Sequence, residues 1–351
     1  MNHNTVKGTR LEPSPTPTYG RHMATTSPGT MRAILQDAYG TTDVWHVGEI
    51  AVPAYAEREV LMKVEAAGLD RGTWHLMTGV PYVARLALGL RRPKQRVPGR
   101  DVAGTVVAVG SAVTRFAVGD AVFGIAPGAF AEYAVGREDK LAHAPTRLTP
   151  SQAAAVPISG MTALRALRDA GRLEDGQRVL VIGASGGVGT YAVQLAKALG
   201  ADVTGVSSTA KTELVRSLGA DRVIDYTKDD FADGAARYDL ILDVGGSSSL
   251  SRLRRALAPK GTLVIVGGEG GGNLTGMGRQ LRALASSRFL RQRLTVLVPK
   301  EHHTELERLT EYIEAGAVAP TIDRTYPLER AADAMQQLIA GHVQGKVTIT
   351  I

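Results

Sequence analysis

Apolar and polar positions in the first part of the chain follow the alternation that is typical of β-strands. Three runs alternate or are rich in β-branched side chains, at residues 59–67, 103–109 and 129–135. Turns that contain Gly or Pro separate them, at residues 98–101, 118–120 and 126–128. This pattern predicts a Greek-key or barrel-like β domain over residues 31–150.

The pattern changes near residue 151 to an alternation of strands and helices. An apolar run at 178–182 precedes residues 188–199, where apolar side chains repeat on one helical face. The segments that follow are a strand at 202–206, a helix at 211–218 and strands at 221–225, 240–244 and 262–266. Such alternation predicts a doubly wound parallel sheet covered by helices over residues 151–299.

The last part of the chain is expected to return to the first domain. Residues 300–351 contain two helical patterns, at 301–315 and 328–339, and a final strand at 346–351. At the other end, residues 1–30 are polar, rich in Pro and without periodicity, and GRHM at 20–23 is typical of an expression tag with a protease site. Residues 1–30 are therefore expected to be a leader outside the fold, which begins near Met31.

Composition narrows the chemistry. A length of 351 residues is enough for about two domains. The chain has no Cys, which excludes disulfides, Cys-ligated zinc, iron–sulfur clusters and a thiol nucleophile, and fits a reducing, cytoplasmic location. No apolar run reaches the roughly 18 residues that span a bilayer. The net charge is +7, but two of these charges belong to the leader, so no nucleic-acid partner is expected.

The clearest local motif is a glycine-rich turn between an apolar strand and a helix. ASGGVG at 184–189 fits the dinucleotide fingerprint G-x-G-x-x-G with Ala in the first position. Such a turn leaves backbone amides open to a pyrophosphate at the positive end of the helix dipole, and Gly189 lets the helix approach the strand. The expected contact residues are Ala184, Ser185, Gly186, Gly187 and Val188. The alternative is a glycine-rich turn without a ligand.

The end of the second strand favours NADPH over NADH. An NAD site usually has Asp or Glu there to bind the ribose hydroxyls, and this strand end has none. Ser207, Ser208 and Lys211 follow instead, and Tyr226 comes after the third strand. Their hydroxyls and the ammonium suit a 2′-phosphate. The alternative for Lys211 is an ordinary solvated helix residue.

Several motifs together resemble the medium-chain dehydrogenase/reductase superfamily. They are PGRDVAGTVVAVG at 98–110, SGMTAL at 159–164, ASGGVG at 184–189 and SLGAD at 217–221. The resemblance runs from Met31 to the end. Within the superfamily the chain is most similar to the zinc-independent quinone oxidoreductases and double-bond reductases, including the chloroplast-envelope quinone oxidoreductase homologues, through VRSLGADRVIDY and GHVQGKVTI.

This resemblance implies a GroES-like β-rich catalytic domain plus a Rossmann domain. It also implies NADPH-dependent reduction of quinones, or of the C=C bond of α,β-unsaturated carbonyls, and a homodimer. The zinc enzymes of the superfamily use Cys and the His of a G-H-E motif. Here the matching residues are Gly99-Arg100-Asp101, and a guanidinium has no lone pair to offer a metal. No metal site is expected, and His302 and His303 are expected to be solvated.

The candidate catalytic residues follow the first long strand. Asp70 stands where the reductases have Asn, and an ionised carboxylate accepts but does not donate a hydrogen bond. Trp74 and Tyr82 are the other candidates, with Tyr82 a possible donor to an enolate; packing for Trp74 is the plainer alternative. By resemblance Thr162 contacts the nicotinamide side. Further expected cofactor contacts are Val266, Gly267 and Gly268 at a strand's carboxyl end, and Lys346, which is otherwise an edge-strand charge.

Two other functions stay open. One is a zinc-free alcohol dehydrogenase or carbonyl reductase, and the other is a non-enzymatic cofactor-binding or RNA-binding protein. The basic segment at 83–96 is expected to be a lid or a solvated loop, with membrane-surface contact as a third alternative. The basic residues 279–293 are candidates for a cap over the cleft.

Overall fold

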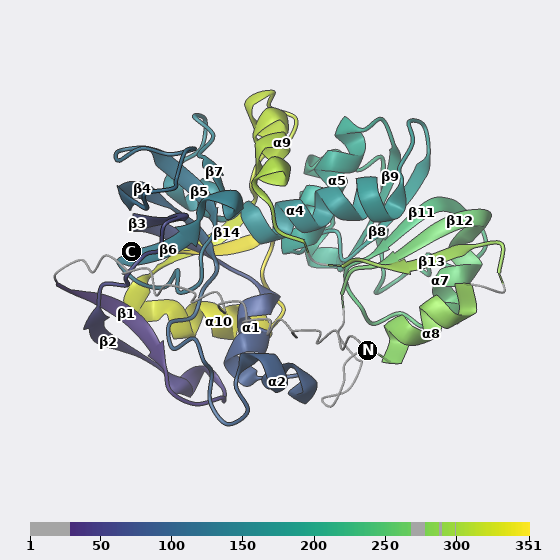
Figure 1. Ribbon diagram of the computed structural model, residues 1–351. Helices are drawn as coiled ribbons and strands as arrows, with labels where there is room; N and C mark the ends of the chain where they lie inside the picture. The colour runs from purple at the N-terminus through teal and green to yellow at the C-terminus, as the bar shows by residue number, and fades with distance from the viewer. Residues whose placement is uncertain (1–28, 268–277, 288–289, 299) are drawn as a thin grey trace, which may run out of the picture.

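The computed structural model describes residues 29–267, 278–287, 290–298 and 300–351. Two lobes lie side by side (Figure 1): a β-rich lobe that holds the first strands and the C-terminus, and an α/β lobe built from the middle of the chain. The predicted combination of a β-rich domain and a doubly wound parallel sheet is confirmed. The domain limits 31–150, 151–299 and 300–351 stay predictions.

The β-rich lobe is organised around a sheet of seven strands in the described residues, in the order β14-β15-β3-β4-β5-β7, with β6 paired to β3. Their bounds are β3 (Glu59–Leu69), β4 (Asp101–Val109), β5 (Ala121–Ile125), β6 (Tyr133–Arg137), β7 (Leu141–His143), β14 (Ile322–Pro327) and β15 (Lys346–Thr350). β1 (Thr30–Gln36) and β2 (Trp45–Ala51) form a separate antiparallel pair. Apolar side chains of these strands, such as Val60, Met62 and Ile349, fill one core.

One predicted strand was placed wrongly. The run 129–135 becomes a strand only from Tyr133, because the amides of Ala129 and Phe130 donate to the carbonyls of Gly99 and Pro98 instead of to a ladder. Phe130 is fully buried, and a Cβ on Gly99 would lie 2.4 Å from its ring. The apolar pattern there therefore marks a buried loop.

The α/β lobe contains a parallel sheet of six strands in the described residues, in the order β10-β9-β8-β11-β12-β13. Their bounds are β8 (Arg178–Ile182), β9 (Asp202–Ser207), β10 (Arg222–Asp225), β11 (Tyr238–Asp243), β12 (Leu257–Ile265) and β13 (Arg293–Val296). The strand order reverses between β8 and β11, and open α/β sheets bind ligands outside the carboxyl ends of the strands at such a point.

Helices cover both sheets and connect the lobes (Figure 1). Their bounds are α1 (Arg71–Thr78), α2 (Arg85–Leu88), α3 (Pro150–Ala154), α4 (Pro157–Arg165), α5 (Gly187–Ala198), α6 (Thr212–Ser217), α7 (Leu250–Ala256), α8 (Gly278–Ser287), α9 (His303–Glu314) and α10 (Ala331–Ile339). Short 3-10 turns are η1 (Thr42–Val44), η2 (Tyr82–Ala84), η3 (Glu138–Lys140), η5 (Thr209–Lys211) and η6 (Leu328–Arg330), and the π-helix η4 (Ala166–Gly171) follows α4 directly. The sequence pattern predicts α5, α6, α9 and α10 within a few residues, whereas α1, α2, α3, α4 and α7 were not predicted.

The C-terminal strand returns to the first sheet. β15 runs antiparallel to β3, with Val347 opposite Leu69, and parallel to β14. β14 and α10 already belong to the β-rich lobe, and β15 is the strand between β14 and β3 of its sheet. Lys346 begins this strand, and the preceding Gly345 bridges to Gly186, so the start of β15 lies at the junction of the two lobes.

Candidate active site

The glycine loop joins β8 to α5. Gly183 has φ +83°, a conformation that favours glycine, and the amides of Gly183 and Ala184 donate to the Val206 carbonyl at 3.2 and 3.0 Å. Gly186 caps α5, whose first N–H groups have no partner within the helix. The loop therefore presents free donors at the positive end of a helix dipole, as an anion site requires.

Close approach requires glycine at one position of the loop and leaves little room for a side chain at a second. A Cβ on Gly189 would lie 2.1 Å from the Gly183 carbonyl oxygen, so only glycine lets α5 pack against the loop. A Cβ on Gly187 would lie 3.1 Å from Lys346 Cδ and 3.3 Å from Ser159 Oγ. Gly187 thus faces Lys346 from the other lobe and Ser159, a buried residue that the sequence reasoning did not select.

Residues of the β-rich lobe also contact the glycine loop. Gly345 N donates to the Ser185 carbonyl at 2.8 Å, and Gly186 and Gly345 form a parallel bridge. Lys346 itself is buried, and its Nζ lies 3.1 Å from Asp101 Oδ2. Because β15 lies between β14 and β3, the alternative of an edge-strand charge for Lys346 is wrong.

Asp101 is the buried partner of Lys346. Its Oδ1 accepts the Ile158 amide at 2.9 Å. Burial, opposed by the charge of Lys346 and assisted by the charge of Asp70, raises the pKa of Asp101 to about 7. The matching family motif contains this residue, yet sequence reasoning used it only to argue against zinc. Its role as the counter-charge of Lys346 depends on a contact across 245 residues of chain.

Asp70 caps α1 beside this pair. Its Oδ1 accepts the Thr73 amide at 2.8 Å, and Gly68, two residues earlier, is paired in register with Asp101. Asp70 Oδ2 is buried and has no hydrogen-bond partner among the described residues. A buried carboxylate oxygen without a partner is unfavourable unless a ligand or a proton satisfies it.

The other two catalytic candidates lie further along the same segment. Trp74 is half-buried, packs against the core of the first sheet and meets His75 edge-on at 4.8 Å. Tyr82 in η2 is largely exposed, and the guanidinium of Arg85 stacks 4.8 Å from its ring centre. No hydrogen bond in the described structure joins Tyr82 to Asp70 or Lys346, so the structure does not bring Tyr82 into the buried cluster.

The carboxyl edge of the parallel sheet places the remaining nicotinamide-side candidates. Val266 and Gly267 amides both donate to the Asp243 carbonyl at 3.1 Å, and a Cβ on Gly267 would lie 2.3 Å from the Val244 oxygen. Thr162 is half-buried on α4, one turn after Ser159. Gly268 lies outside the described residues.

Among the described residues of the segment 279–293, Arg279 contacts this edge. Arg279 of α8 forms an ion pair with the fully buried carboxylate of Asp243 and donates to the Gly246 carbonyl. Asp243 ends β11, the strand next to β8 at the switch point. The expected cap is therefore in contact with the sheet edge at Arg279.

At the other end of the site, the candidates for the 2′-phosphate lie after β9. Ser207 is buried, Ser208 is partly exposed and Tyr226 is largely exposed. Lys211 is half-buried, and its Nζ donates to the carbonyls of Gly341 and Val343 at 2.9 and 2.8 Å. Burial lowers the pKa of Lys211. Lys211 is thus not an ordinary solvated residue, and two of its three N–H donors are engaged.

A carboxylate missed by the sequence analysis stands beside these residues. Asp225 ends β10 directly opposite Ser207 in register. The Thr209 hydroxyl donates to its Oδ2 at 2.5 Å, the Thr227 hydroxyl donates to its Oδ1 at 2.7 Å, and these bonds hold the pKa of Asp225 at about 2. The dinucleotide-binding rule places the acidic residue at the end of the second strand, which is β9. Asp225 instead comes from the third strand, β10, and reaches the same place because β9 and β10 are paired.

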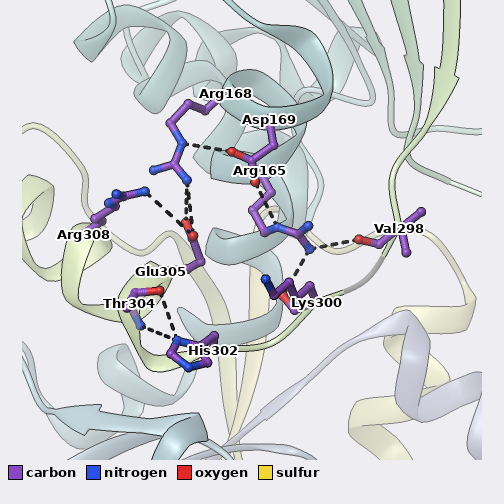
Figure 2. Close-up of polar contacts among 9 residues, drawn as sticks. All are labelled: Arg165, Arg168, Asp169, Val298, Lys300, His302, Thr304, Glu305 and Arg308. Atoms are coloured by element: carbon purple, nitrogen blue, oxygen red, sulfur yellow. Dashed lines mark hydrogen bonds and ion pairs between the residues drawn. The ribbon is translucent and has the colours of Figure 1, made fainter.

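The segment that follows β13 makes polar contacts with both lobes (Figure 2). Arg165 of α4 donates to the carbonyls of Val298 and Lys300, and Arg168 binds Glu305 of α9 at 3.2 Å. Glu301, which follows Lys300 in the chain, forms ion pairs with Arg100 and Lys140 of the β-rich lobe. Arg100, which replaces the zinc-ligating His, therefore has a structural partner.

The two adjacent histidines begin α9. His302 caps the helix and contacts Thr304, and His303 lies 3.1 Å from Glu307 and is partly buried, so the prediction of solvation does not hold for His303. Among the described residues no group of three or more His, Asp or Glu side chains is arranged to hold a metal ion. None of the described helices has the length and apolar content needed to span a bilayer.

Comparisons with known proteins agree with this fold. An alcohol dehydrogenase GroES-like domain model matches residues 56–146, and a zinc-binding dehydrogenase model matches residues 218–349. The chain is 34% identical over 339 residues to the chloroplast envelope quinone oxidoreductase homolog of Arabidopsis thaliana, covering 91% of this chain and 98% of that protein.

Two further relatives extend the comparison. The NADPH-dependent alkenal/one oxidoreductase, chloroplastic, of Arabidopsis thaliana is 34% identical over 341 residues, covering 92% of this chain and 80% of that protein. The structure of the quinone oxidoreductase from Coxiella burnetii has a TM-score of 0.82 at 29% identity, covering 92% of this chain and 100% of that one. The chain belongs to the quinone oxidoreductase family of the medium-chain dehydrogenase/reductase superfamily.

Proposed function

We propose that this protein is an NADPH-dependent oxidoreductase that reduces quinones or the C=C bond of α,β-unsaturated carbonyls without zinc. The observation that carries the proposal is the junction of the glycine loop with the Lys346–Asp101 pair and Asp70. It places an anion-binding helix end next to a buried proton-holding cluster. The names of two relatives, a quinone oxidoreductase homolog and an NADPH-dependent alkenal/one oxidoreductase, support the same chemistry.

The loop fits a dinucleotide. A Cβ on Gly186 would meet no atom closer than 3.5 Å, so the backbone stays open there, and the amides at the start of α5 would hold the pyrophosphate. Thr162, Val266 and Gly267 would border the nicotinamide, and Ser207, Ser208, Lys211 and Tyr226 the adenosine phosphate. NADPH, when bound, supplies the hydride.

The chain's own contribution is positioning and a proton. Asp70 Oδ2 has no hydrogen-bond partner in the described structure, and Asp101 holds its proton up to about pH 7. The neighbouring charge of Asp70 contributes to the raised pKa of Asp101, so we assign Asp101 as the proton-holding group of this cluster. Asp70 Oδ2, which has no partner in the described structure, would accept a hydrogen bond from a donor of the substrate or cofactor.

The test is oxidation of NADPH against a panel of quinones, enones and aldehydes, with NADH in parallel. We expect turnover with quinones or enones and a higher kcat/KM with NADPH. Turnover of aldehydes alone would assign the protein to the carbonyl reductases. Tight, steeply salt-dependent RNA binding with no NADPH oxidation on any substrate would overturn the enzymatic proposal.

Zinc independence, a cytoplasmic location and a homodimer belong to the same proposal. The replacement of His by Arg100 and the absence of Cys support zinc independence. Activity that survives extensive dialysis against a chelator would agree with it, and activity restored only by added zinc would contradict it. Light scattering in solution measures the oligomeric state.

A further inference from the structure

Residues 82–96 carry an exposed apolar row beside a basic cluster. On η2 and α2, Leu86 is 72% exposed, and Leu90 just beyond α2 is 67% exposed. Tyr82 and Val83 are each nearly half exposed. Leu86 lies on α2, and Leu90 follows the turn at Gly89, which has φ +119° and ends the helix. Four large side chains within nine residues of chain are thus exposed to solvent, and such a gathering is typical of an interaction surface.

The row leads directly into positive charge. Arg91, Arg92 and Lys94 are exposed and make no ion pair within the described residues, whereas Arg96 binds Asp37 at 2.7 Å. With Leu90, Pro93, Arg96 and Asp37 they line a cavity of about 620 Å³. Asp37 is the one carboxylate in that lining, and it already forms an ion pair with Arg96. The cavity is therefore cationic and has an apolar residue at its border.

The backbone under this surface is held in place. Tyr39 OH donates to the Gly89 carbonyl at 2.7 Å, and Lys94 N donates to the Leu88 carbonyl at 2.8 Å. Arg85 donates to two carbonyls of the preceding turn and stacks between the rings of Tyr39 and Tyr82. These contacts hold α2 in place while the side chains of Leu86 and Leu90 remain in water.

We propose that residues 82–96 are a docking surface for an anionic lipid membrane. Leu86 and Leu90 enter the boundary between headgroups and acyl chains, Arg91, Arg92 and Lys94 contact lipid phosphates, and the cavity receives one headgroup. Exposed apolar side chains next to unpaired cations are the combination that interfacial membrane binding requires. A two-fold contact between copies would instead bring two like-charged clusters together. This inference goes beyond the proposed activity and does not depend on it.

The experiment is co-sedimentation of the full chain with vesicles of phosphatidylcholine alone or mixed with phosphatidylserine. We expect binding to the mixed vesicles that weakens with salt, and little binding to phosphatidylcholine alone. Because each cation near an anionic surface contributes about fivefold in binding, the variant R91Q/R92Q/K94Q should bind about a hundredfold more weakly. Leu86→Ser with Leu90→Ser should weaken binding at least about tenfold.

Matched controls come from two other surfaces, one beside α7 in the α/β lobe and one in the loop between β4 and β5 of the β-rich lobe. Arg254, Arg255 and Arg291 line a separate basic cavity, so R254Q/R255Q/R291Q removes the same charge elsewhere. Val118, 66% exposed, is the control for the apolar row, as Val118→Ser. If both charge variants lose binding equally, the attraction is a property of net charge alone and the proposed surface is wrong.

Insertion can be measured directly because the chain has no Cys. A polarity-sensitive dye on Leu86→Cys should shift to the blue on mixed vesicles, and the same dye on Val118→Cys should not. No shift at position 86 would overturn the proposal. So would binding of soluble glycerol phosphate that competes fully with vesicles, or a dimer that Leu86→Ser with Leu90→Ser dissociates, since these outcomes assign the surface to a free anion or a second copy.

Discussion

At the Lys346 end of the candidate site the charged groups are buried, and at the Lys211 end they are only partly so. Lys346 and Asp101 are enclosed by both lobes and pair with each other. Lys211 instead binds backbone carbonyls, and the charge of Asp225 is held by hydroxyls. Because Lys346 and Asp101 are buried, removing either partner should be strongly destabilising. Solvent screens the charges of Lys211 and Asp225, so a change of either residue should have a smaller electrostatic effect. The following predictions test this contrast.

The largest expected effect is on stability. Lys346→Met removes the partner of a buried carboxylate, which typically costs about 3–5 kcal/mol. Urea unfolding should show this loss. Lys197→Met is the control, because Lys197 pairs with Asp221 at 2.8 Å on the surface, where a pair contributes less than about 1 kcal/mol. Equal losses in the two variants would contradict the contrast between the ends.

The second effect is on the pH dependence of stability. Burial raises the pKa of Asp101 from 3.8 to about 7, so the folded protein holds this proton more tightly than the unfolded chain. The stabilisation is full below about pH 4 and is lost as the pH rises through about 7. We expect the free energy of unfolding to fall by about 3 kcal/mol more in the wild type than in Asp101→Asn between about pH 4 and pH 7. A parallel fall in both proteins would exclude Asp101.

The third effect is on cofactor affinity. Gly187→Ala places a methyl group 3.1 Å from Lys346 Cδ and 3.3 Å from Ser159 Oγ, at the start of α5. We expect the Kd for NADPH to rise about tenfold, equal to about 1.4 kcal/mol, in a fluorescence titration. Gly278→Ala, where a Cβ would meet nothing within 4 Å, is the matched control and should leave the Kd unchanged.

The smallest effect concerns the choice of cofactor. Asp225→Asn removes a negative charge next to Ser207, so a 2′-phosphate should bind better by about threefold, within the range of a partly screened charge. The readout is the ratio of kcat/KM with NADPH to that with NADH. An increase confined to NADH would indicate that Asp225 does not face the 2′ position. Thr227→Val, which keeps the carboxylate, should change the ratio less.

Local patterns accounted for much of the fold and the glycine loop. The period-2 and helical patterns located β8, β9, α5 and β15 to within about a residue, because those segments are buried on defined faces. The fingerprint located the turn at Gly186, since its chemistry is local. The pattern failed at Ala129 and Phe130, where an apolar alternation belongs to a buried loop.

The charged part of the site was harder to predict because its contacts join distant residues. Lys346 was identified as a candidate, but its partner Asp101 was not, and Ser159 and Asp225 were missed. Asp101 and Lys346 are 245 residues apart and meet through the pairing of β3 with β4 and with β15. Asp225 reaches Ser207 only through the pairing of two strands.

The sequence by itself determined the two kinds of lobe, the glycine loop and the absence of Cys ligands, since each depends on residue types or on their short spacing. Only the tertiary structure decided that Lys346 is buried, that Asp70 has an oxygen without a partner, and that Lys211 is tied to the Gly341 and Val343 carbonyls. The physical reason is that burial and pairing depend on which distant segments close over a side chain, and a one-dimensional pattern does not contain that information.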